Sequence, residues 1–301
     1  MNYEIITPVV TAFNKNEEID YKANERIIDF LIEGGVNGIL VLGSAGEFTG
    51  LSYEEKKDFF KFYSEYVDGR IDLYAGTGCM SFDEVVTLSN DVKNLNYKGA
   101  VVIGPYYYNL DQEKIFIYYD KLAKSVNGSV YLYNFPARTG YSINHKTIKK
   151  LINNNTNIIG LKDSVSEPVH TNLCILETRE DNFNVFSGFD DQFLYNIAAG
   201  GKGCISALSN IVPEIWSELV KASNEGYFDK SINYQSLIQE LMPLYNMDSN
   251  FSYLFKLLMV YRGVELNPTA IFPFNQIDKN IINKSKDILD AVLEKFNKIK
   301  N

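Results

Sequence analysis

Short apolar segments recur along this chain at a nearly constant interval, and this periodicity constrains the fold more than any other feature. The starts of successive segments lie about 26–34 residues apart, and the last gap is about 19, close to one strand with its following helix. Eight such units predict an α/β fold of the (β/α)₈ TIM-barrel type. The eight segments have the length and composition of buried strands: Glu4–Val10, Gly38–Leu42, Asp72–Gly76, Gly99–Ile103, Ser129–Tyr133, Ile158–Lys162, Asn184–Ser187 and Gly203–Ser206.

The segments between these strands have helical periodicity. Residues 53–63 are one example, and Ser52 with Glu55 three residues later predicts a capping box at the start of that helix. An open doubly wound sheet is the main alternative from the pattern alone. No GxGxxG motif follows the first strand, and eight units suit a closed barrel.

The strand pattern ends before Pro213, and helix-like segments continue to Asn301. Breaks are expected at Met247–Ser249 and at Asn267–Pro273. We therefore predict a barrel over residues 1–212 and a C-terminal helical extension over residues 213–301, packed on the barrel as one structural unit.

Composition excludes several classes of protein. The net charge of −9 argues against non-specific nucleic-acid binding, and the lysines near the C-terminus alternate with acidic residues as on a solvated helix face. No apolar run is long enough to span a bilayer. The first residues show no export signal. We expect a cytoplasmic protein with no nucleic-acid or membrane partner.

Cysteines and histidines are few. Cys79, Cys174 and Cys204 are widely spaced, which predicts reduced, partly buried thiols. His145 and His170 both lie in polar segments, so a histidine-based metal site and a Ser-His-Asp triad are not expected.

Lys162 is the most informative single residue. It ends an apolar, β-branched run that predicts a buried parallel strand, where an unpaired ammonium is costly. Burial favours the neutral amine, and a neutral amine attacks carbonyl groups. The alternative is that the chain leaves the sheet at this point, so that Lys162 reaches water or pairs with Asp163.

Other predicted strands also end in residues that suit a reactive site. Gly43–Phe48 contains two glycines whose turn suits an anion, although a plain turn is equally compatible. Tyr106–Tyr108 follows the fourth strand, and at least one of these rings is expected to pack.

The fifth strand ends at Tyr133, which suits a proton shuttle or a half-buried packing role. Arg138 follows and suits either a substrate carboxylate or a surface acid. The seventh and eighth strands end near Gly188, Ile205 and Ser206. Residues 200–203 precede a strand, which favours a tight turn over a phosphate loop.

Together these motifs resemble the pyruvate-dependent class I aldolase family typified by dihydrodipicolinate synthase and N-acetylneuraminate lyase. The resemblance runs from Thr7 and Pro8 into the helical tail. Its motifs are GxxGE at Gly43–Glu47, YNxPxxTG at Tyr133–Gly140 and the strand that ends at Lys162.

The resemblance implies a role for each matching residue. Lys162 would form a Schiff base with the 2-keto carbon, and Tyr133 would shuttle protons. Ser44 would hold Tyr133 in a relay with Tyr107 of a neighbouring subunit, as part of a homotetramer. The remaining candidates for binding pyruvate and its aldehyde partner, or a 2-keto-3-deoxy acid, are Ala45 and Gly46 through their N–H groups, with Arg138, Gly188, Ile205 and Ser206. This chemistry requires no metal and no cofactor.

The subfamily is less sharply defined. Dihydrodipicolinate synthases usually carry two threonines where this chain has Ser44 and Ala45, and a glutamate where it has Asp163. Further features resemble 2-keto-3-deoxy sugar-acid aldolases: Phe48, Phe135, Gly160–Asp163, Ser249–Phe251 and Ile271–Pro273. Arg138 instead matches the synthases.

We therefore favour retro-aldol cleavage of a 2-keto-3-deoxy sugar acid to pyruvate and a hydroxyaldehyde. The alternative is 4-hydroxy-tetrahydrodipicolinate synthesis from pyruvate and aspartate semialdehyde. An N-acetylneuraminate lyase and a non-catalytic keto-acid-binding barrel are further alternatives. A flavin- or phosphosugar-dependent barrel would need a phosphate-binding turn late in the barrel, which Gly188 and the residues after it match poorly.

Overall fold

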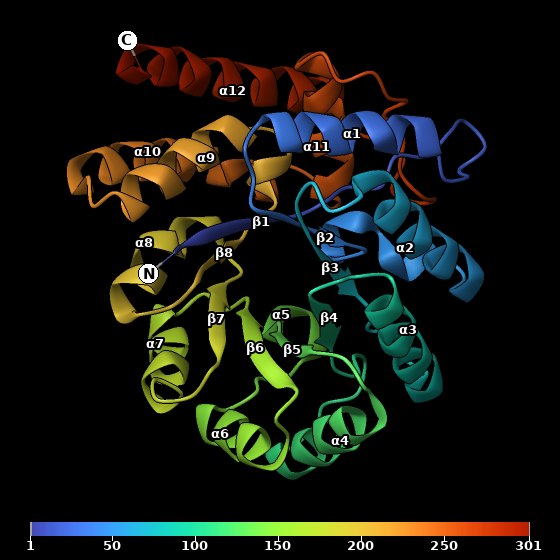
Figure 1. The fold of residues 1–301 in the computed structure, drawn as a ribbon. Coiled ribbons are helices and arrows are strands. Elements are labelled where there is room, and N and C mark those ends of the chain that lie inside the picture. The colour runs from blue at the N-terminus through green and yellow to red at the C-terminus, as the bar shows by residue number, and fades with distance from the viewer. Residues whose placement is uncertain (1, 301) are drawn as a thin grey trace. The chain divides into compact units, whose positions relative to one another are not determined.

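The computed structural model describes residues 2–300, and its eight strands form a closed parallel barrel in chain order (Figure 1). The predicted fold class is confirmed, and each predicted strand boundary lies within two residues of the observed one. The strands are β1 (Glu4–Pro8), β2 (Gly38–Val41), β3 (Asp72–Gly76), β4 (Gly99–Ile103), β5 (Val130–Asn134), β6 (Ile158–Asp163), β7 (Asn184–Ser187) and β8 (Gly203–Ile205).

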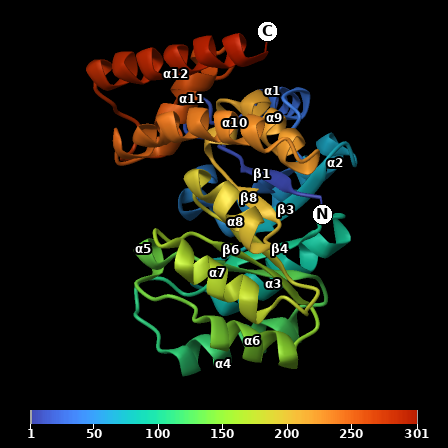
Figure 2. The ribbon, with the colours of Figure 1, turned by 90° about the vertical axis from the view of Figure 1, so that its left-hand side faces the viewer.

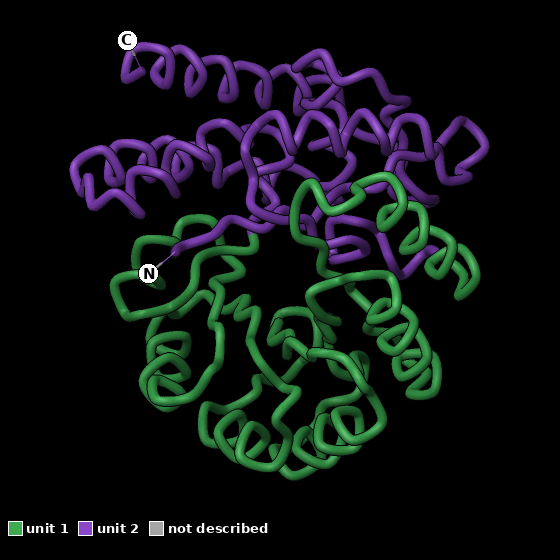
Figure 3. Tube along the Cα trace, in the orientation of Figure 1, with its two compact units in different colours: residues 1, 52–205 green, residues 2–51, 206–301 purple. Residues whose placement is uncertain are grey.

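Two compact units make up the chain (Figure 3). The first spans residues 52–205 and carries β3 to β8, with α3, α4, α6 and α7 outside the strands (Figure 1). Its helices are α2 (Tyr53–Val67), α3 (Phe82–Asn94), α4 (Gln112–Ser125), α5 (Pro136–Thr139), α6 (His145–Asn154), α7 (Pro168–Glu177) and α8 (Phe193–Ala199), with the 3₁₀ turn η3 (Asp190–Gln192).

The second unit joins residues 2–51 to residues 206–300. It contains the parallel pair β1 and β2, in which Thr7 lies opposite Ile39. Its helices are α1 (Tyr21–Glu33), α9 (Pro213–Asn224), α10 (Phe228–Leu241), α11 (Phe251–Tyr261) and α12 (Lys279–Lys300), with the 3₁₀ turns η1 (Ser44–Gly46), η2 (Phe48–Gly50), η4 (Leu208–Asn210) and η5 (Met242–Asn246).

The C-terminal part of the second unit is helical, as predicted from residue 213 onward. The long helix α12 packs against α10 and α11 (Figure 2). The expected breaks fall between η5 and α11 and in the segment between α11 and α12. The division of the chain at residues 212 and 213 stays a prediction.

Local sequence signals explain several element boundaries. Ser52 and Glu55 form the predicted capping box of α2, in which each side chain bonds to the other residue's backbone N–H. Gly200 ends α8 with φ of 101°, a conformation that favours glycine, so the segment before β8 is a tight turn as predicted. All residues of β4 and β5 are buried, as expected for strands covered on both faces.

Two predictions from composition can be compared with the structure. The three cysteines are free thiols, and all are buried rather than partly buried. Across residues 2–300, no helix combines the length and apolar character that crossing a bilayer requires.

Candidate active site

The end of β6 places Lys162 beside Tyr133 of β5. Parallel pairing sets these two residues opposite each other, so their side chains lie on the same face of the sheet. Both are buried, and only 3% of Lys162 is exposed. The Lys162 Nζ atom lies 4.4 Å from the centre of the Tyr133 ring. The amine and the phenol predicted to act together are therefore neighbours.

Neither structural alternative for Lys162 matches this arrangement. The residue remains within β6, and with 3% of it exposed it does not extend into bulk solvent. Asp163 follows on the opposite face of the strand, and its carboxylate is hydrogen-bonded to Asn134, His170 and Thr171. Within residues 2–300, no carboxylate forms an ion pair with the Lys162 amine. A buried amine without a carboxylate partner suits a nucleophile.

A row of side chains leads from Lys162 to the surface of this unit. The rings of Tyr133 and Phe135 stack with their centres 5.7 Å apart. The guanidinium carbon of Arg138, an exposed residue of α5, lies 5.9 Å from the Phe135 ring centre. The short helix α5 was not predicted, and it turns Arg138 back over Phe135. The row provides an amine, a phenol, an apolar surface and a cation in sequence.

Gly188, just after β7, lies against the chain that leaves β6. Its N–H donates to the Asp163 carbonyl at 2.8 Å. A Cβ atom at Gly188 would stand 2.0 Å from the Ser164 Oγ and 3.0 Å from the Ser164 Cα. Because part of this clash is with backbone, only glycine fits without a shift of the chain beside Lys162.

In the second unit, the predicted anion turn is the 3₁₀ turn η1. Ala45 and Gly46 are both buried there. The Gly46 N–H already donates to the Gly43 carbonyl at 2.9 Å, so a bound carboxylate would have to share it. Glu47 follows with φ of 55°, a left-handed conformation that is uncommon for glutamate.

A second buried lysine, not predicted from the sequence, holds this turn. Lys256 of α11 is fully buried, and its Nζ atom lies 2.5 Å from Glu47 Oε1 and 3.0 Å from the Thr11 carbonyl. Thr11 in turn donates its hydroxyl to the Gly46 carbonyl at 2.8 Å. Burial lowers the pKa of Lys256, and the neighbouring Glu47 opposes this shift only in part. No short-range motif links Lys256 to Glu47, which is why the pair was missed.

Ser206 also belongs to the second unit, immediately after β8. It is fully buried, and its N–H donates to the Ile6 carbonyl of β1 at 3.0 Å. The Ser206 carbonyl accepts a hydrogen bond from the Ser209 hydroxyl. The oxygen of that hydroxyl also lies 2.8 Å from Thr7 Oγ1, within hydrogen-bond distance. Ile205, the last residue of β8 in the first unit, is buried as well.

Tyr107 is 86% exposed, and Arg138 is the only other predicted site residue that is exposed. Its φ of 86° is strained for a bulky side chain, and its ring meets that of Tyr108 edge-on. Backbone strain of this kind is concentrated at functional sites. Within its own unit, Tyr107 projects into solvent.

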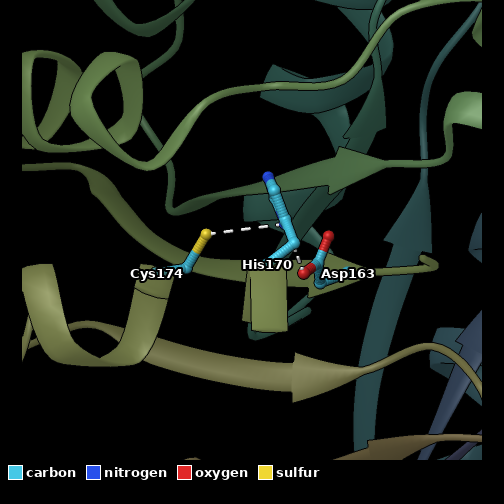
Figure 4. Close-up of side chains that lie close together, drawn as sticks. All are labelled: Asp163, His170 and Cys174. Carbon is cyan, nitrogen blue, oxygen red and sulfur yellow. Dashed lines mark hydrogen bonds and ion pairs between the residues drawn. The ribbon is translucent and has the colours of Figure 1, made fainter. Parts of the chain in front are cut away.

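One group of side chains has metal-ligand character. Ligand-type atoms of Asp163, His170 and Cys174 lie within 4.8 Å of one another (Figure 4). The Asp163 carboxylate and both His170 nitrogens take part in hydrogen bonds of normal length. His170 was predicted only to lie in a polar segment, and its position seven residues after Asp163 was the signal that could have linked the two.

Comparisons with known proteins agree with this geometry. Residues 1–292 match the Dihydrodipicolinate synthetase family. The chain belongs to this family. The prediction that the protein is a pyruvate-dependent carbon–carbon lyase is confirmed at the level of the family.

Individual relatives cover nearly the whole chain. "Putative 2-dehydro-3-deoxy-D-gluconate aldolase YagE" of Escherichia coli is 33% identical over 91% of this chain and 92% of its own length. The crystal structure of YagE in complex with pyruvate superposes with a TM-score of 0.93 at 32% identity, covering 96% of this chain and 98% of that one. A 4-hydroxy-tetrahydrodipicolinate synthase of Hydrogenobaculum is 36% identical over 81% of this chain and 83% of its own length.

Proposed function

We propose that this protein cleaves a 2-keto-3-deoxy sugar acid into pyruvate and a hydroxyaldehyde through a Schiff base on Lys162. The observation that carries the proposal is the buried Lys162 amine against Tyr133, without an ion-pair partner among residues 2–300. A relative named as a sugar-acid aldolase over most of the chain supports the choice of substrate class.

The proposed reaction begins when the Lys162 amine attacks the C2 keto carbon. Tyr133 gives its proton to the C2 hydroxyl, which leaves as water, and a protonated imine and a phenolate remain. The phenolate then takes the proton of the C4 hydroxyl. The C3–C4 bond breaks, its electrons move toward the imine, and the aldehyde departs from an enamine. Protonation of C3 and hydrolysis of the imine release pyruvate and restore the amine.

The remaining predicted residues have supporting roles in this proposal. The N–H groups of Ala45 and Gly46 bind the substrate carboxylate, and Ser44 connects Tyr133 to Tyr107 of a neighbouring subunit. The backbone around Gly188, Ile205 and Ser206 lines the space for the substrate chain. A single donor pair at η1 is enough to orient a carboxylate, since hydrogen bonds to charged groups are strong.

One observation favours the second candidate, 4-hydroxy-tetrahydrodipicolinate synthesis. Arg138 is exposed at the end of the row from Lys162, where a cation would suit the carboxylate of aspartate semialdehyde. In that reaction the same enamine attacks an aldehyde instead of being released from one. Arg138 in a sugar-acid aldolase would bind a hydroxyl or a distal carboxylate.

Two assays on one protein sample separate these functions. We expect wild-type protein to release pyruvate from 2-keto-3-deoxygluconate or a related sugar acid, and Lys162→Ala to release none. Condensation of pyruvate with aspartate semialdehyde is measured in parallel. If only the condensation proceeds, and Arg138→Ala abolishes it, the sugar-acid assignment is wrong.

We further propose that the protein is a cytoplasmic homotetramer. Three free, buried thiols are typical of a reducing compartment. The exposed Tyr107 supports an assembly, because its predicted role requires a second subunit to receive it.

A further inference from the structure

A buried hydrogen-bonded cluster lies on the face of β6 opposite to Lys162. Asp163 follows Lys162 in the strand, so its side chain lies on that opposite face, against α7. The carboxylate is fully buried. It accepts hydrogen bonds from Asn134 Nδ2 and Thr171 Oγ1, each at 2.7 Å. It also accepts one from His170 Nδ1 at 2.9 Å (Figure 4).

The second ring nitrogen of His170 also meets an acceptor. Its Nε2 atom lies 2.9 Å from the Ile143 carbonyl oxygen and 3.4 Å from the Ser142 hydroxyl. A carboxylate and a carbonyl only accept hydrogen bonds, so both ring nitrogens must carry a hydrogen. The neutral ring carries only one, and either tautomer would turn a lone pair toward an oxygen. A neutral ring with its hydrogen on Nδ1 could accept only from the more distant Ser142 hydroxyl at 3.4 Å, while its Nε2 lone pair would face the Ile143 carbonyl oxygen at 2.9 Å. The geometry therefore favours an imidazolium.

The groups around His170 are consistent with a single ion pair. Asp163 faces it from β6, and Cys174 faces it from its own helix, with Sγ 3.8 Å from Nδ1. Burial raises the pKa of the Cys174 thiol, which therefore stays neutral. The segment before α6 presents only the uncharged Ser142 and Ile143 groups. Burial lowers the pKa of His170, but the hydrogen bond and charge of Asp163 and the Ile143 carbonyl raise it, and the net shift is upward.

The cluster joins the two strand ends that carry the proposed reactive pair. Register places Asn134 opposite Asp163 and Tyr133 opposite Lys162. The Asn134–Asp163 hydrogen bond therefore holds, on one face, the same two strand ends that present Tyr133 and Lys162 on the other. Asn134 Oδ1 also accepts the Ile143 N–H at 2.9 Å. His170 thus closes a ring of contacts that connects β5, β6, α7 and the segment before α6.

We propose that His170 is a positioning residue for Lys162. As an imidazolium, His170 clamps Asp163, and with it the end of β6, to the segment that contains Ile143. The proposal rests on the proposed Schiff-base role of Lys162. Loss of the His170 proton at higher pH breaks one of its two hydrogen bonds. The end of β6 then loosens, and the Lys162 amine is less well oriented toward a keto group.

The sign of the pH dependence follows from the direction of the shift. A histidine whose folded pKa is raised stabilises the protein fully below its unfolded pKa of about 6.5. That stabilisation is lost as the pH rises through the folded pKa. Wild-type protein should therefore lose the clamp at alkaline pH, whereas a variant without His170 lacks it at every pH.

The test compares wild-type protein with His170→Gln, and His145→Gln is the matched control because the chain has only these two histidines. Nitrogen-15 NMR of histidine-labelled protein reports whether both ring nitrogens are protonated. Trapping with borohydride and pyruvate at a series of pH values reports the rate of imine formation. Both readouts use the intact chain, and the NMR measurement uses wild-type protein, so it does not depend on the variant folding.

We expect the His170 ring to stay doubly protonated to a higher pH than the ordinary histidine pKa of about 6.5 allows, and its signals to be absent in His170→Gln. Imine formation in His170→Gln should be slower by about 10²-fold at pH 6, as for a misplaced reacting group. This deficit should shrink as the pH rises through the His170 transition, and His145→Gln should match wild type throughout. Loss of the second ring proton at or below the ordinary histidine pKa of about 6.5, or a deficit of constant size at every pH, would overturn the proposal.

Two further outcomes separate this proposal from its alternatives. If wild-type protein forms no pyruvate adduct, the proposed function itself fails. If it forms the adduct and His170→Gln forms it equally fast, only the positioning role fails. A shift of the His170 signals on addition of one equivalent of Zn²⁺, with loss of Cys174 thiol reactivity, would show that the cluster is a metal site and would also overturn the proposal.

Discussion

Lys162 and Tyr133 lie at matching positions of two adjacent parallel strands, so the geometry of the sheet itself brings the amine and the phenol together. Each is followed by a residue that points to the other face, Asp163 and Asn134, and these two are hydrogen-bonded at 2.7 Å. In the proposed mechanism, chemistry and support are divided between the two faces of the same strand ends. Substitutions on the two faces should have different effects.

Removing the Tyr133 hydroxyl tests the reactive face. Tyr133→Phe should still form the pyruvate imine but turn over substrate about 10²- to 10⁴-fold more slowly, the usual contribution of a positioned acid–base group. Steady-state kinetics with the sugar acid measures this change. Tyr131→Phe, two residues earlier on the same face, is the matched control and should remain close to wild type. Full activity of Tyr133→Phe would remove Tyr133 from the proton-transfer role.

Gly188 tests the close contact beside Lys162. Gly188→Ala should destabilise the fold by about 1–3 kcal/mol, as overpacking does, and should slow pyruvate trapping. Chemical denaturation and trapping rates measure the two effects. Adding Ser164→Gly removes the Oγ and Cβ atoms that the new methyl group would meet. The double variant should therefore recover part of the lost stability and part of the lost trapping rate. Wild-type behaviour of Gly188→Ala alone would show that this contact relaxes freely.

At the scale of elements, the turn η1 depends on a helix that lies far away in the sequence. Lys256 of α11 binds Glu47 and the Thr11 carbonyl, and Thr11 binds Gly46. Removing one partner of a buried ion pair leaves the other charge uncompensated. The orientation of the proposed carboxylate-binding N–H groups should therefore respond to a substitution in α11.

Lys256→Met should lower the free energy of unfolding by about 3–5 kcal/mol and raise the pyruvate concentration needed for trapping. Denaturant titration and trapping at varied pyruvate concentration measure these changes. Lys298→Met, which breaks an exposed ion pair with Glu294, is the control and should alter neither property. A double variant Lys256→Met, Glu47→Gln should recover part of the lost stability. Equal stability of Lys256→Met and wild type would show that the pair carries little net energy.

Elements with a strong local pattern were predictable, and contacts between distant residues were not. The strands follow from apolar runs, and the start of α2 follows from Ser52 and Glu55. The four-residue helix α5 is too short for a periodic pattern. The Lys256–Glu47 pair joins residues 209 positions apart. The hydrogen bond between His170 and Asp163 could be predicted only by knowing that α7 packs its first turn against the end of β6.

At the scale of the whole molecule, Tyr107 is the residue that links activity to assembly. It is exposed and strained within its own unit, and its predicted role lies in a neighbouring subunit. We expect sedimentation analysis to show that the active protein is at least a dimer. An active monomer would contradict the shared relay.

Mixing two inactive variants tests this sharing directly. Tyr107→Phe should lose most activity, and Lys162→Ala should lose all of it. Mixed oligomers contain sites that combine an intact Lys162 with an intact Tyr107 of the partner subunit, so activity should return after co-refolding. Tyr108→Phe, the adjacent exposed tyrosine, is the control and should stay active. Absence of recovery in verified mixed oligomers would place Tyr107 outside the relay.

The central claim is that one buried amine forms a covalent imine with pyruvate. Borohydride reduction of the protein with pyruvate, followed by peptide mass mapping, tests it most directly. We predict a single reduced pyruvyl adduct on Lys162 that is absent from Lys162→Ala. An adduct on another lysine, such as the buried Lys256, or no adduct on the wild-type protein, would contradict it.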